Sequence, residues 1–132
     1  MNRTIIPALA AAALVVAVGP GSVDARTLKK NPVPAVRETG PAVSCVPLAQ
    51  LRDSHVRDDR TIDFMRDRKR GWRNVLPQEC PGLKSADTFS YETSLSQLCS
   101  VDIIHVLNQY GGSYQRGAAC GLGKFQPIEL VK

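Results

Sequence analysis

The clearest strand–turn–strand pattern of the sequence lies at residues 61–76, which read TIDFMRDRKRGWRNVL. Ile62 and Phe64 alternate with polar neighbours, which is the period of a half-buried β-strand. The charged run RDRKRG at 66–71 cannot belong to a core, and its closing glycine is typical of a hairpin turn. The strand resumes at 72–76. The sequence therefore predicts a β-hairpin with a strongly basic tip.

The same period of two continues on both sides of this hairpin. Upstream, Val46 and Leu48 open a strand that we expect to bend and to end at residues 55–56. Downstream, further strands are predicted at 89–93, 101–107 and 125–131. Residues 101–107 are β-branched and apolar on both faces, so we expect a central strand that is buried on both sides. Five to six antiparallel strands with short turns predict a mainly β fold, a small curled sheet or barrel.

One segment also fits a helix. Ser94 to Gln97 matches a capping box, and apolar residues at helical spacing follow it as far as Gly111. The strand is favoured because β-branched residues lose side-chain freedom in a helix. A single helical turn at 94–98 before the strand would satisfy both patterns, and the glycine-rich segment before Cys120 is expected to be a loop.

The first 25 residues have the three parts of a secretory signal peptide. A basic start precedes an apolar run, Ile5–Val18, that is shorter than the about 20 residues of a membrane span. Small residues at the third and first positions before the cut predict cleavage after Ala25. Residues 26–43 are charged and proline-rich, so we expect a flexible, disordered linker. A single domain at 44–132 follows, and the mature chain is expected in the periplasm or outside the cell.

All four cysteines lie in that domain, at Cys45, Cys80, Cys99 and Cys120. An even number in a small exported chain is typical of two disulfides, and the spacing is too wide for zinc ligands. In an up-and-down meander, the first and third cysteines lie at one end of the sheet and the second and fourth at the other. A strand of six residues spans about 20 Å, whereas bonded cysteines have Cα atoms within about 7 Å. We therefore expect Cys45–Cys99 and Cys80–Cys120.

The chain is basic, with 17 Lys and Arg against 12 Asp and Glu and a net charge of +5. This balance favours anionic partners, and the interspersed acidic residues argue against specific nucleic-acid binding. The hairpin tip concentrates the charge and could hold phosphate or carboxylate groups beside an indole. The alternative is a charged hairpin end that discourages edge-to-edge pairing. The candidate anion-binding residues are Arg66, Arg68, Lys69, Arg70, Trp72 and Arg73.

Patterns for catalysis and metal binding are weak. A nucleophilic site needs serine or cysteine beside a histidine, and only His55 and His105 are present. Residues 111–115 lack the final glycine of a nucleophile elbow. The aspartates between 53 and 63 lack the calcium-loop pattern and are interpreted as turn carboxylates paired with arginines. We therefore predict no catalytic residue, no metal and no cofactor.

Several spaced motifs resemble one family. They are SC at 44–45 through RD at 52–53, DDRTI at 58–62, RN at 73–74, CPGL at 80–83, LCSVDI at 98–103 and CGLG at 120–123. Together they resemble a domain-of-unknown-function family of small exported four-cysteine proteobacterial proteins, over about residues 44–128. The resemblance implies a four-cysteine β domain in the cell envelope, and it implies no activity or ligand.

These observations together predict a non-enzymatic binding or structural module, periplasmic or secreted. Its expected partner is a periplasmic protein or an anionic polymer of the envelope. Two alternatives stay open. One is a small hydrolase that uses a pair of carboxylates. The other is an inhibitor of a secreted enzyme, which only the size and the disulfides suggest.

Overall fold

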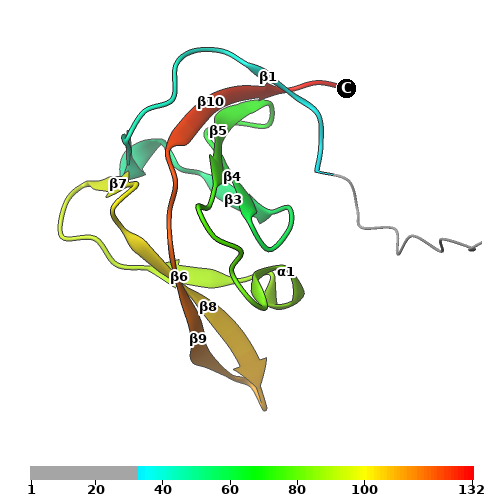
Figure 1. The fold of residues 1–132 in the computed structure, drawn as a ribbon, viewed down its shortest axis with the longest axis vertical. Coiled ribbons are helices and arrows are strands. Elements are labelled where there is room, and N and C mark those ends of the chain that lie inside the picture. The colour runs from blue at the N-terminus through cyan, green and yellow to red at the C-terminus, as the bar shows by residue number, and fades with distance from the viewer. Residues whose placement is uncertain (1–32) are drawn as a thin grey trace, which may run out of the picture.

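The computed structural model describes residues 33–132 (Figure 1). The predicted signal peptide and the first part of the predicted linker lie outside these residues. The described part is built from short antiparallel strands, with one 3-10 turn and one short helix, α1. The strands are β1 (Val36–Glu38), β2 (Cys45–Pro47), β3 (Asp53–Val56), β4 (Thr61–Met65), β5 (Arg70–Val75), β6 (Phe89–Tyr91), β7 (Gln97–Cys99), β8 (Ile103–Tyr110), β9 (Ser113–Gly121) and β10 (Phe125–Leu130). The 3-10 turn is Leu48–Gln50 and α1 is Leu83–Ala86. The predicted mainly β fold is confirmed.

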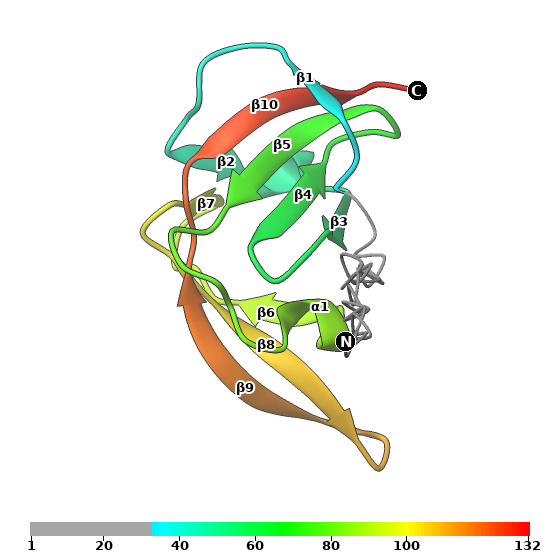
Figure 2. The same ribbon diagram turned by 45° about the vertical axis from the view of Figure 1, so that its right-hand side comes forward.

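The largest sheet has the order β1-β10-β5-β4-β3 and contains the predicted hairpin at its centre (Figure 2). In the hairpin β4–β5, Phe64 lies opposite Trp72. The last strand, β10, returns to pair with β5, and β1 pairs with its other side, where Val36 lies opposite Leu130. The sheet therefore begins inside the segment predicted to be a linker. There β1 supplies hydrogen-bond partners for backbone groups on the outer edge of β10.

Two smaller sheets complete the fold, β6-β8-β9 and β2-β7. The three sheets do not close into a barrel, so the curled-sheet form of the prediction is the one confirmed. Both views show the β8–β9 hairpin extending away from the rest of the molecule (Figures 1 and 2). No helix in the described part of the chain is long and apolar enough to cross a membrane.

The strand predicted at 101–107 exists as β8, but it is not buried on both faces. Ile104 and Val106 are buried, whereas Ile103 is half-exposed and Val101 lies before the strand with 85% of its surface exposed. The three-stranded sheet thus covers the core with one face only. An apolar residue on the other face is tolerated because folded proteins expose much apolar surface.

The segment after β8 was wrongly predicted to be a loop. Gly111 and Gly112 both adopt positive φ, at 57° and 87°, and form the tight turn of a hairpin. The nine residues of β9 then pair back along β8. Few of these residues are apolar, so alternation could not reveal the strand. The glycine pair was the available signal.

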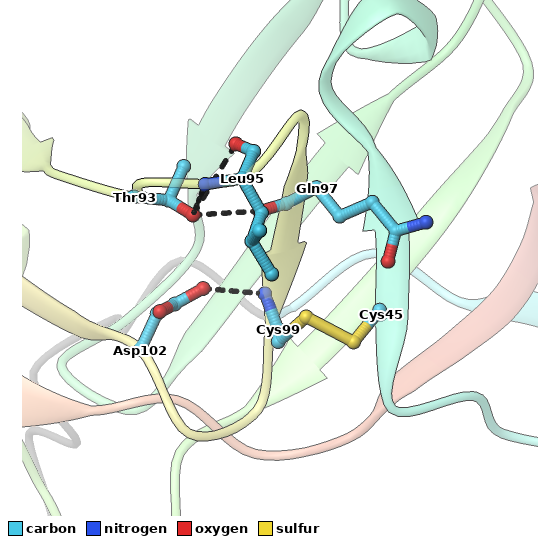
Figure 3. Close-up of a disulfide and its surroundings, with 6 residues drawn as sticks. All are labelled: Cys45, Thr93, Leu95, Gln97, Cys99 and Asp102. Atoms are coloured by element: carbon cyan, nitrogen blue, oxygen red, sulfur yellow. Dashed lines mark hydrogen bonds between the residues drawn. A yellow bond between two sulfur atoms is a disulfide. The ribbon is translucent and has the colours of Figure 1, made fainter.

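The predicted helical turn at 94–98 is not formed, because residues 94–96 are bends and residues 97–99 belong to β7. The Thr93 hydroxyl accepts a hydrogen bond from the Leu95 N–H at 3.3 Å and donates to the Gln97 carbonyl at 2.9 Å (Figure 3). Such local bonds from a threonine favour a turn over a helix. The turn leads directly into β7.

Two disulfides form with the predicted pairing. Cys45 and Cys99 lie opposite each other on β2 and β7, with Cα atoms 4.0 Å apart (Figure 3). Cys80 is fully buried, and its bond to Cys120 ties the loop before α1 to β9, with Cα atoms 5.8 Å apart. Of the predicted meander, only the pairings β3–β4, β4–β5 and β6–β8 are found. Two disulfides in so small a domain indicate an oxidising environment.

The core lies between the largest sheet and the β6-β8-β9 sheet. Phe64 contributes from β4 and contacts Phe89 and Phe125, with ring centroids 6.0 and 5.6 Å away. Leu83 of α1 and Leu98 of β7 close the ends of this cluster. The buried set consists of Val46, Val56, Ile62, Phe64, Leu76, Cys80, Leu83, Leu98, Ile104, Val106, Leu122 and Phe125.

Candidate anion-binding site

The basic tip of the β4–β5 hairpin is an ordered turn that one carboxylate organises. Asp67 Oδ1 accepts hydrogen bonds from the backbone N–H groups of Lys69 and Arg70, at 2.9 and 2.8 Å. Its Oδ2 accepts from Arg70 Nε at 3.0 Å. These bonds, led by the one from the Lys69 backbone, hold the pKa of Asp67 below its usual value. The turn therefore fixes the backbone from which the basic side chains project.

A cavity of about 450 Å³ lies beside this tip, between the ends of β3, β4 and β10. Two of the side chains that line it, Met65 and Leu130, are apolar. The other side chains are charged or polar. They are Arg52, Asp53, His55, Arg66, Asp67 and Arg68.

The guanidinium groups at this cavity differ from the others in the structure. Residues 33–132 contain nine arginines, and six have the guanidinium bonded to a carboxylate or a carbonyl. The remaining three are Arg52, Arg66 and Arg68, for which no such partner is found among the described residues. All three line the same cavity. Their donors are thus directed to solvent at one place, where an anion could accept hydrogen bonds from them.

The carboxylates at the cavity do not neutralise this charge. Three arginines and two aspartates line it, so the sum is 3 − 2 = +1 with His55 neutral. Asp67 already accepts three hydrogen bonds within its own turn. Asp53 Oδ1 accepts the Ser54 N–H at 2.8 Å, and its Oδ2 lies 3.2 Å from His55 Nε2. The cavity therefore keeps a cationic rim.

A second set of charges nearby is used for the fold. Asp63 of β4 is fully buried, and it accepts bonds from Arg57 Nε at 2.8 Å and Arg73 Nε at 2.7 Å. Arg73 donates a further bond through a terminal nitrogen at 2.9 Å. A buried carboxylate needs such partners, because an unpaired charge would be very costly inside a protein. Both arginines are therefore committed to Asp63.

The structure separates the six predicted anion-binding residues into groups. Arg66 and Arg68 line the cavity, and Lys69 is exposed in the turn beside them. Arg70 is bonded to Asp67, and Trp72 packs partly against the core. Arg73 is held by Asp63, as described above. Arg52 was not among the predicted residues, and it reaches the cavity because its N–H pairs with the Met65 carbonyl at 2.9 Å.

Other candidate residues have structural roles in the described part of the chain. Asp58 and Asp59 accept backbone bonds from Arg60 and Lys84, at 2.8 Å each. His105 lies in β8 opposite Ser90, and no hydrogen bond joins the two side chains. Across residues 33–132, no three His, Cys, Asp or Glu side chains gather closely enough to hold a metal ion.

Comparison of the whole chain with protein-family models, with characterised proteins and with solved structures finds no match. The resemblance drawn from the spaced motifs therefore stays a prediction.

Proposed function

We propose that this protein is an exported, non-enzymatic binding module that holds an anionic group at the arginine-lined cavity. One observation carries the proposal: Arg52, Arg66 and Arg68, whose guanidinium groups have no partner among residues 33–132, converge on a single cavity. Guanidinium groups match phosphate and carboxylate oxygens well, because they donate parallel hydrogen bonds. The disulfides agree with export, since such bonds persist in oxidising compartments.

The ligand class that fits is a polymer with repeated phosphate or carboxylate groups. The cavity lies open at the end of a sheet, and the exposed Lys69 extends the positive surface along the tip. A polymer can contact the cavity and the tip together, which a small anion cannot do. Electrostatic contacts of this kind release counterions, so affinity should depend steeply on salt.

The hydrolase alternative has less support at this site. A carboxylate pair needs one member to stay protonated near neutral pH, and burial or a like charge usually raises its pKa. The hydrogen bonds to Asp67 act in the opposite direction and lower its pKa. We therefore favour binding without catalysis.

Binding of the purified protein to fluorescent polyphosphate at increasing salt tests this proposal. Three phosphate contacts predict a slope of log Kobs against log[salt] of roughly −2 to −3. The variant Arg52→Ser/Arg66→Ser/Arg68→Ser should lose this binding. A matched control, Lys84→Ser/Arg116→Ser/Lys124→Ser, removes the same charge from exposed sites that do not line the cavity and should keep most of it. Equal losses in both variants would mean that net charge alone attracts the polymer, and the proposed site would be wrong.

A further inference from the structure

The β8–β9 hairpin carries a long strand edge without a partner in the described structure. In the sheet β6-β8-β9, β9 pairs with β8 on one side only. It spans nine residues, Ser113–Gly121, and seven of them are exposed. Its outer backbone groups are therefore available to another strand.

This edge lacks most features that protect free edges in other proteins. Proline, lysine and aspartate are absent from β9, and its one charge, Arg116, is ion-paired with Glu92. A register shift places one extra residue in β9 opposite the step from His105 to Leu107, which bends the strand locally. The free edge of β3 differs, because it carries Asp53 and His55. Among the edges described, β9 is the long and nearly neutral one.

The outward-facing side chains of β9 are suited to such a contact. Near the tip, Tyr114 has 58% of its surface exposed and pairs with Gln109. Toward the base, Ala119 is exposed and pairs with His105. Gln109 and His105 are four residues apart on β8, so Tyr114 and Ala119 lie on the same face of the sheet. An exposed aromatic ring and a small apolar side chain thus share that face.

We propose that two copies of the chain pair through their β9 edges, antiparallel and about a two-fold axis, into one six-stranded sheet. Antiparallel pairing places the tip of each strand beside the base of the other. Tyr114 of each copy would then lie near Ala119 of the other copy, on the exposed face of the combined sheet. A two-fold interface makes each contact twice, so one favourable pair of features serves both subunits. Tyrosines in such central contacts often contribute much of the binding energy.

The shape and charge of the molecule support a second copy as the occupant. The hairpin projects from the body, so two hairpins can lie side by side while the bodies stay apart (Figures 1 and 2). Residues 103–121 contain one arginine and no acidic residue, although the chain as a whole carries +5. Repulsion between the copies is therefore small where they would meet. The interface lies on a different sheet from the arginine-lined cavity, so the inference is independent of the proposed function.

Sedimentation equilibrium of the purified protein from micromolar to millimolar concentration tests this inference. We expect a monomer–dimer equilibrium that Tyr114→Ala weakens by about tenfold or more, the loss typical of a central interface tyrosine. Tyr110→Ala is the matched control, because Tyr110 is equally exposed, at 59%, but lies on β8 across the turn. It should leave the equilibrium unchanged. A monomer throughout, or equal effects of both substitutions, would overturn the inference.

Hydrogen exchange of the unmodified protein gives a second readout that needs no substitution. Backbone amides on the outer side of β9 should exchange more slowly as concentration rises, because pairing with a second strand protects them. Amides of the β3 edge should not change. Protection that is independent of concentration at residues 113–121 would contradict pairing through β9.

Discussion

Replacing each disulfide by two alanines measures how much that disulfide contributes to stability. Two effects are compared: the length of the loop that the bond closes and the burial of its sulfur atoms. The Cys45–Cys99 bond spans 54 residues and the Cys80–Cys120 bond spans 40. In the chain-entropy model these loops correspond to about 4.2 and 3.9 kcal/mol of unfolding free energy at 25 °C. By loop length alone, the first bond should matter slightly more.

Burial reverses that order. Cys80 is fully buried within the hydrophobic cluster, whereas Cys45 and Cys99 are only half-buried. Removing a buried sulfur leaves unfilled space, at a cost of about 1 kcal/mol or more. We therefore expect losses of about 5 kcal/mol for Cys80→Ala/Cys120→Ala and about 4 kcal/mol for Cys45→Ala/Cys99→Ala, by these two contributions together.

Urea denaturation of both double variants, beside the oxidised parent protein, measures these losses. The slope m should rise in both variants, because the unfolded chain becomes less compact, so free energies and not midpoints should be compared. A larger loss for the Cys45–Cys99 pair would refute the argument from burial. Losses below about 1 kcal/mol in both variants would refute the argument from loop closure.

Three further predictions concern single sites. Asp63→Ala should lower the free energy of unfolding by about 3–5 kcal/mol, because it leaves Arg57 and Arg73 partly buried without their partner; a loss below about 1 kcal/mol in urea denaturation would contradict this. Asp67 has a pKa below its usual 3.8, so the stability that its ionised carboxylate contributes is complete above pH 3.8 and is lost as the pH falls through the lowered pKa. The urea midpoint of Asp67→Asn should therefore be lower than that of the parent protein at neutral pH, and the two midpoints should converge in strong acid. Export predicts that N-terminal sequencing of protein from the periplasm begins one residue after Ala25, and a chain that keeps its first residues in the membrane fraction would contradict the signal peptide.

The central hairpin was predictable because alternation and turn chemistry agree there. Ile62 and Phe64 are buried as predicted, although Thr61, Asp63 and Met65, which alternation places on the other face, are buried too. The charged turn between the strands is held by Asp67. The β9 strand was missed because its side chains contact little of the core. A strand of that kind is specified by its neighbour's backbone and by the turn at Gly111, which periodicity does not measure.

The candidate site was predictable only in part for a related reason. Clustering along the sequence identified Arg66 and Arg68, which lie in the cavity wall. It also grouped Arg73 with them, although that side chain points to Asp63 on the neighbouring strand. Arg52 comes from a different strand and reaches the same cavity through sheet pairing. Contacts across strands depend on register, which local composition does not determine.

The order of the two disulfides along the chain has a consequence for what happens when a protease cuts the protein. Four cysteines can be joined in three ways. Pairing neighbours in sequence would let one cut between the two loops divide the protein, and nesting one loop inside the other would let two cuts release the inner piece. In the observed arrangement, Cys45–Cys99 and Cys80–Cys120 overlap. One cut in each of any two of the three intervals between successive cysteines therefore leaves all the resulting fragments covalently joined, so a nicked molecule stays a single particle.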